Sequence, residues 1–171
     1  MVEPFISGYA LQWGRPATIG GAFVERFERG AFDKSLRDHP DVAALWAHDT
    51  SRPLGRVSNG SLTLKVDSIG LWYSLVPNLE SPSGQEAVAA VGRSDVGQVS
   101  VGFSAIVEEW ADNGELPSRK ITEARLWELS LVLWGAYGDA TSASLTRAEA
   151  NAANASRRRA EAAMRRRGIS A

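Results

Sequence analysis

The sequence predicts an α+β domain built mostly from antiparallel strands, which form a curved sheet or small barrel, with a basic tail behind it. Three observations predict this class. About six or seven segments alternate apolar and polar residues as strands do, two short segments favour helices, and the composition changes sharply near the C-terminus. The chain has 171 residues, of which 44% are hydrophobic, which is enough to bury the core of one domain.

The strand predictions rest on alternation. Residues 61–66 and 71–75 alternate on either side of the turn-rich segment 67–70, which predicts a hairpin. Residues 42–46 alternate as well and lead directly to His48.

Two longer strands are predicted at residues 96–107 and 121–133. In the first of these, Val99 and the alternate residues after it share one face. Ser100 and Gly102 lie on the opposite face, which is small and polar.

Helices are predicted at residues 31–37 and 85–91, and charge marks a boundary further along. From Arg147 onward there are seven arginines and two glutamates, a net charge of +5; the whole chain carries −1, so residues before Arg147 carry −6. We therefore expect a protein domain at residues 1–143 and a basic tail at residues 144–171. The tail is rich in alanine and arginine, so it is expected to be helical or disordered.

Several classes of protein are excluded by what the chain lacks. It has no cysteine, which excludes disulfides, thiolate zinc sites and cysteine nucleophiles. Residues 1–6 have neither the basic nor the apolar region of a secretory signal. The most apolar late stretch, residues 126–137, contains Glu128 and is far shorter than the ~20 residues that span a bilayer. An intracellular protein outside the membrane is expected.

The chain has only two histidines, His39 and His48, that could serve as a base. His39 lies in an Asp-His-Pro-Asp turn and is expected at the surface. His48 ends an apolar strand beside Asp49, where it could reach a cleft or simply be structural.

Ser100 becomes a nucleophile only if a base activates it and a third group orients that base. Its position alone also fits a serine on the solvent face of a sheet. Gly102, two residues on, leaves room for another backbone or a substrate.

Glu128 is an acid within an apolar run, so burial requires a hydrogen-bond partner. That partner could be an imidazole N–H, a backbone turn or Arg125. Glu123, Asp49 and Asp95 are weaker candidates for the same role.

Several segments in a fixed order carry a family resemblance. They are Ser7-Gly8-Tyr9-Ala10, residues 27–36, Leu45-Trp46-Ala47-His48-Asp49 with Pro53-Leu54-Gly55-Arg56, Val99-Ser100-Val101-Gly102-Phe103, and Leu126-Trp127-Glu128-Leu129-Ser130 with Ala136-Tyr137. With these motifs, about residues 6–140 resemble the prohead (capsid-maturation) serine proteases of tailed bacteriophages. Val101 and Gly135 stand where the family usually has phenylalanine and proline, and neither change removes a site residue.

The resemblance implies a fold related to the herpesvirus assembly proteases, a small, mostly antiparallel β-barrel with a few surrounding helices. It implies that His48 is the general base, Ser100 the nucleophile and Glu128 the residue that orients His48. Backbone N–H groups near the nucleophile strand, with Arg56 or Arg125, would stabilise the oxyanion.

The resemblance also implies what the enzyme acts on. The substrates would be the scaffold, or the scaffold-like arm of the major capsid protein, and the protease itself, inside the prohead as it assembles in the host cytoplasm. A homodimer is a further expectation from the herpesvirus relatives. No cofactor, metal or membrane partner is expected. A nucleic-acid partner is not expected either, because the basic tail has no aromatic residues to stack on bases.

Other readings of the sequence stay open. The same fold could serve as a non-catalytic scaffold or assembly module. An esterase is disfavoured because no Gly-x-Ser-x-Gly motif surrounds Ser100. The tail is either a solvated segment without a partner or a tether to acidic scaffold or capsid surfaces that self-cleavage trims.

Overall fold

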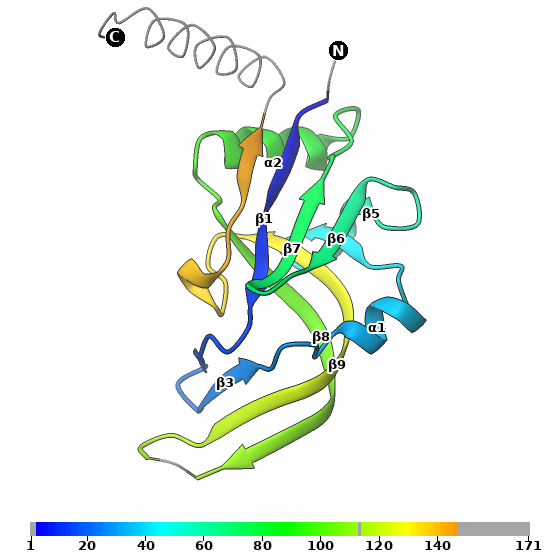
Figure 1. The fold of residues 1–171 in the computed structure, drawn as a ribbon. Helices are drawn as coiled ribbons and strands as arrows, with labels where there is room; N and C mark the ends of the chain where they lie inside the picture. The colour runs from blue at the N-terminus through cyan, green and yellow to red at the C-terminus, as the bar shows by residue number, and fades with distance from the viewer. Residues whose placement is uncertain (1–2, 113, 147–171) are drawn as a thin grey trace, which may run out of the picture.

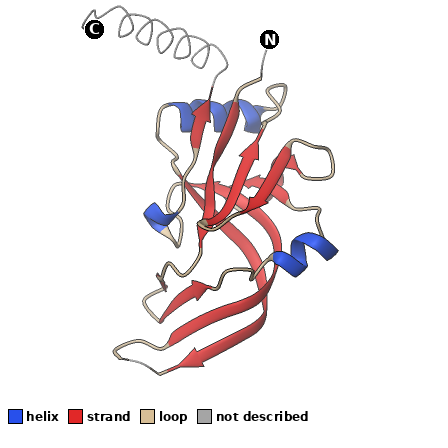
Figure 2. Cartoon of the chain, viewed as in Figure 1, coloured by secondary structure: helices blue, strands red, loops and turns tan. Residues whose placement is uncertain are grey.

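A computed structural model describes residues 3–112 and 114–146 of the chain (Figure 1). Two sheets dominate it, and the helices are few and short (Figure 2). In chain order the elements are β1 (Phe5–Gln12), β2 (Ala17–Ile19), β3 (Phe23–Phe27), α1 (Asp33–Asp38), β4 (Ala43–Trp46), β5 (Asp49–Arg56), β6 (Leu62–Val66), β7 (Gly70–Leu75), α2 (Pro82–Gly92), β8 (Gln98–Ala111), β9 (Ser118–Val132), the 3-10 turn η1 (Gly138–Ala140) and β10 (Ser144–Thr146).

The smaller sheet has the strand order β10-β1-β7-β6, with antiparallel neighbours throughout. The larger sheet has the order β2-β3-β9-β4-β5, and β8 pairs with β9. Within the described residues these sheets do not close on each other, so the expected barrel is not confirmed. The larger sheet is also mixed, because β3 and β4 both run parallel to β9.

The hairpin predicted at residues 61–75 is confirmed as β6 and β7, joined by a turn at Asp67. The long strands predicted around Ser100 and Glu128 are confirmed as β8 and β9, and both short helices are present as α1 and α2. Helix α2 begins at Pro82, earlier than the expected residue 85, because the Ser81 hydroxyl accepts a hydrogen bond from the Gly84 N–H and so caps the helix there.

The tail, expected to be helical or disordered from residue 144, begins instead with a strand. Ser144–Thr146 forms strand β10, which pairs with the first residues of β1. The edge of β1 holds this short segment, so pairing in the sheet decides the conformation of these three residues. The rest of the predicted tail lies outside the described residues. The tethering and self-cleavage predicted for the tail concern those same residues and stay predictions.

One core joins the two sheets and α2. Leu11, Leu71 and Tyr73 bury their side chains from the smaller sheet, and Phe27 and Leu129 from the larger one. In the described part of the chain, no helix is long and apolar enough to cross a bilayer.

Strand β9 organises the region that carries the predicted site. Its buried face holds Leu129 and Leu131, so the alternate residues Glu128 and Ser130 share the other face. At this point β9 has β8 on one side and β4 on the other. Residues on three neighbouring strands are thereby brought to one face.

Candidate active site

His48 lies in the two-residue turn that joins β4 to β5. The turn is flanked by the pair Trp46 and Asp49, and its two residues, Ala47 and His48, have φ of 52° and 61°. Positive φ at both central positions is the backbone that a type I′ hairpin turn requires, and alanine rarely adopts it. Strained backbone of this kind persists only where its surroundings hold it.

Strand β9 supplies what holds the turn. The Ala47 N–H donates to the Leu131 carbonyl at 3.0 Å, and the His48 N–H donates to the Ser130 Oγ, also at 3.0 Å. Ser130 is fully buried, so this second contact is sheltered from water. The backbone of His48 is therefore anchored to β9 at Ser130.

The imidazole of His48 meets the carboxylate of Glu128. Nδ1 of His48 lies 2.6 Å from Oε1 of Glu128, and the other carboxylate oxygen, Oε2, accepts the Ser130 hydroxyl at 2.7 Å. An ionised carboxylate only accepts hydrogen bonds, so this contact places the imidazole proton on Nδ1 and leaves the Nε2 lone pair free. The His48 side chain is 45% exposed and that of Glu128 is 14% exposed. The Glu128 carboxylate, which is largely shielded from water, thus orients the imidazole of His48, and Nε2 is left to act as a base toward a substrate.

The sequence left three possible partners for Glu128: an imidazole N–H, a backbone turn and Arg125. In the structure the partner is the imidazole of His48. Arg125 instead stacks on the ring of Trp127, at 3.9 Å from its guanidinium carbon to the ring centroid.

The space that Gly102 leaves is occupied by the side chain of Glu128. Gly102 and Glu128 face each other across β8 and β9. A Cβ atom built on Gly102 would overlap the Glu128 carboxylate. The glycine therefore provides the space in which the acid reaches His48.

Ser100 faces Ser130 across the same pair of strands and is half-buried. Directly opposed residues of an antiparallel pair lie on the same face, with Cβ atoms about 5 Å apart. Ser100 is thus one strand away from the hydroxyl that anchors His48. Within residues 3–112 and 114–146 the Ser100 hydroxyl makes no hydrogen bond, and nucleophile–base contacts are often long before a substrate binds.

Within the described residues, none of the weaker candidates makes a hydrogen bond or ion pair with the His48 side chain. His39 is exposed beyond the end of α1, as expected. Hydrogen bonds from the hydroxyl and then the N–H of Ser51 lower the pKa of Asp49, the residue next to His48, so this carboxylate is ionised but otherwise engaged. The remaining acids pair elsewhere: Glu123 with Lys34 at 2.9 Å and Asp95 with Arg93 at 3.2 Å.

Ser130 is the site residue that sequence reasoning missed. The Glu128–Ser130 spacing puts both side chains on one face of a strand, and a serine inside an otherwise apolar run needs a partner when buried. Those two signals could have identified it. They could not have shown that its hydroxyl joins the His48 backbone to the Glu128 carboxylate.

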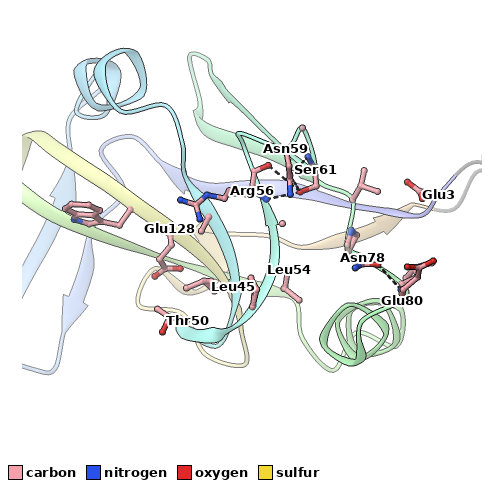
Figure 3. A pocket seen from close by; sticks show the side chains of 18 residues that line it. Glu3, Leu45, Thr50, Leu54, Arg56, Asn59, Ser61, Asn78, Glu80 and Glu128 are labelled. Carbon is pink, nitrogen blue, oxygen red and sulfur yellow. Dashed lines mark hydrogen bonds between the residues drawn. The ribbon is translucent and has the colours of Figure 1, made fainter.

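A groove of about 1120 Å³ begins beside this site (Figure 3). Glu128 lies at one end of its lining, and Glu3 and Glu80 lie at the other. Trp127, the residue before Glu128, also lines the groove. Trp127 is 49% exposed and falls where the β8–β9 register shifts, and its Nε1 donates to the Ser104 hydroxyl at 3.0 Å. Such bulges re-aim side chains beside sites, so Trp127 forms a fixed aromatic wall next to Glu128.

The model of the caudovirus prohead serine protease family matches residues 2–154 of the 171-residue chain. The chain belongs to this family. The match includes every described strand and all three predicted site residues, and it indicates a serine protease class and a role in phage capsid maturation. No curated protein matches the chain.

Proposed function

We propose that this chain is a serine endopeptidase that cleaves the scaffold, or the scaffold-like arm of the major capsid protein, and itself, during prohead maturation. His48 is the general base, Ser100 the nucleophile and Glu128 the residue that orients His48. The observation that carries the proposal is the contact between His48 Nδ1 and Glu128 Oε1, on the same sheet face as Ser100.

The chemistry follows ordinary acyl transfer. His48 Nε2 takes the proton of the Ser100 hydroxyl while Oγ attacks the peptide carbonyl, and the imidazolium then gives that proton to the leaving amine as the C–N bond breaks. Water, deprotonated by the same imidazole, attacks the acyl-enzyme and releases Ser100 with its proton restored. Glu128 stabilises the imidazolium at each stage and stays ionised.

The family's name and the site's geometry support catalysis over a non-catalytic assembly module. A structural histidine has no need of a sheltered carboxylate on Nδ1 together with an Nε2 that makes no hydrogen bond within the described residues. The turn at His48 also keeps two residues at positive φ, which is backbone strain of the kind that collects at functional sites. The co-expression experiment below distinguishes the protease from a non-catalytic assembly module.

The setting proposed for this reaction comes from the family. The enzyme acts inside the prohead as it assembles in the host cytoplasm, with capsid and scaffold proteins as its protein partners. A homodimer is part of the proposal because the herpesvirus relatives form one.

Co-expression with the major capsid protein of the same phage tests this function. Intact masses are compared for the natural chain, for Ser100→Ala, and for the control Ser74→Ala, a half-buried serine of the other sheet. A shortened capsid protein with the natural chain and the control, but not with Ser100→Ala, is the expected result. Uncut capsid protein in all three samples, with proheads still assembling, would favour the assembly module.

A further inference from the structure

The two ends of the groove differ in how far their carboxylates are engaged by other side chains. At the catalytic end, Glu128 is engaged by His48 and Ser130. At the far end, Glu3 and Glu80 are exposed, and neither forms an ion pair within the described part of the chain. The one cation of the lining, Arg56, is neutralised by Asp41, with Nε and Oδ2 2.8 Å apart. The far end therefore carries an excess of negative charge.

Between these ends the lining mixes apolar and polar residues. Its apolar members are Ala43, Leu45, Pro53, Leu54, Val76, Pro77, Leu79 and Trp127. A volume of about 1120 Å³ exceeds the usual range for a small-molecule site, ~300–1,000 Å³. Its size and mixed lining fit a stretch of polypeptide.

The chain itself supplies a segment of opposite charge at the acidic end. The described residues end at Thr146, which pairs with Phe5, two residues from Glu3. Residues 147–171 follow, with seven arginines and two glutamates. Extended, such a segment reaches up to about 80 Å, more than the span of a domain of this size. Six of its arginines lie beyond residue 154, where the family match ends.

We propose that residues 147–171 dock in the groove of the same chain, with arginines at Glu3 and Glu80 and the small alanines against the apolar lining. Attachment beside the groove raises the effective concentration of the segment, so weak charge-assisted contacts suffice. Given the proposed function, the docked segment competes with substrate and is an autoinhibitory contact. Salt weakens the docking, because both carboxylates are exposed.

A distance measurement tests the docking without any catalysis. The chain has no cysteine, so spin labels can be placed by single substitutions in full-length Ser100→Ala protein, where the tail cannot be trimmed by Ser100. One pair joins Leu79→Cys in the groove to Ala160→Cys. The control pair joins Glu115→Cys to Ala160→Cys, because residue 115 lies on the β8–β9 hairpin at the opposite end from α2 (Figure 1).

The expected result is a short, narrow distance distribution for the groove pair and a longer one for the control pair. The distance distribution of the groove pair should broaden when Arg157, Arg158 and Arg159 are changed to glutamine. It should also broaden when Glu3 and Glu80 are changed to glutamine, and at high salt. Broad distributions that do not respond to either set of changes would overturn the proposal. So would a short distance that disappears when labelled chains are diluted with unlabelled ones, since a second copy would then fill the groove.

Competition is measured separately in active full-length protein with a peptide substrate. The triple arginine variant should raise the rate at low substrate about three- to tenfold and leave the rate at saturation unchanged. Glu115→Gln is the matched control for Glu3→Gln with Glu80→Gln, and it should change nothing. Docking without any peptidase activity would refute the proposed function alone; activity with an unchanged rate in the arginine variant would refute the inhibitory role alone.

Discussion

Nδ1 of His48 lies 2.6 Å from Oε1 of Glu128, although 80 residues separate them in the chain. The parallel pairing of β4 with β9 brings them together, because it sets Ala43 beside Glu128 and lets the turn after β4 fold back over Ser130. Ser130 then closes a ring of contacts, since its hydroxyl accepts from the His48 backbone and donates to the Glu128 carboxylate.

Glu128→Gln should reduce kcat/KM on a peptide about 10²- to 10⁴-fold. The glutamine amide no longer stabilises an imidazolium, and it can donate to Nδ1 and so shift the proton of His48 to Nε2, the wrong nitrogen for a base. Thermal unfolding is the control and should change little, because the two side chains are close in size. A variant with nearly natural kcat/KM would remove Glu128 from the mechanism.

Ser130→Ala should lower kcat about 10- to 100-fold with a smaller effect on KM, because both the His48 backbone and the Glu128 carboxylate lose their anchor. Ser130→Thr keeps a hydroxyl and should recover part of the loss. The pH–rate profile is recorded for all three proteins. If the alanine variant keeps the natural rate and profile, the hydroxyl has a structural role only.

Gly102→Ala should abolish activity and lower the free energy of unfolding by about 1–3 kcal/mol. The added methyl overlaps the Glu128 carboxylate, so the acid must leave its place or the strands must shift. The control is Gly97→Ala just before β8, where a Cβ would meet nothing within 4 Å. Equal activity and stability for both variants would contradict the packing described for Glu128.

Stability should fall as the pH drops from about 5 to 3, in part through Asp67 in the β6–β7 turn. Hydrogen bonds from the Gly70 N–H and then the Tyr9 hydroxyl lower the pKa of this carboxyl. A lowered pKa means that the stabilisation is complete above the unfolded value of about 3.9 and is lost as the pH falls through the folded value. Asp67→Asn should therefore show a shallower fall in denaturant midpoint; an unchanged slope would assign the acid sensitivity to other carboxyls.

The local elements could be read from the sequence because their patterns are local. The β6–β7 hairpin has alternation on both sides of a turn that Asp67 stabilises, and α2 has its serine cap and proline. Strand β10 has no such local pattern, because its pairing partner, β1, lies far away in the chain.

The site was less accessible to sequence reasoning. Nothing in the local sequence marks Ala47 and His48 as a type I′ turn, because contacts from Leu131 and Ser130 impose it. The parallel pairing of β4 with β9 leaves no trace in either strand's alternation, so the partner of Glu128 stayed open. The residues alone mark His48, Ser100 and Glu128 as candidates, the family resemblance joins them into one site, and only the fold shows the contact between His48 and Glu128.

The most direct test of the account is labelling by a fluorophosphonate, which reacts with a serine only when a base activates it. The natural chain and the variants His48→Ala, Ser100→Ala and Ser130→Ala are treated, and the modified peptide is located by mass. The account predicts one label, on Ser100, lost in His48→Ala and Ser100→Ala and slowed but kept on Ser100 in Ser130→Ala. Labelling of another serine, or unchanged labelling of Ser100 without His48, would contradict it.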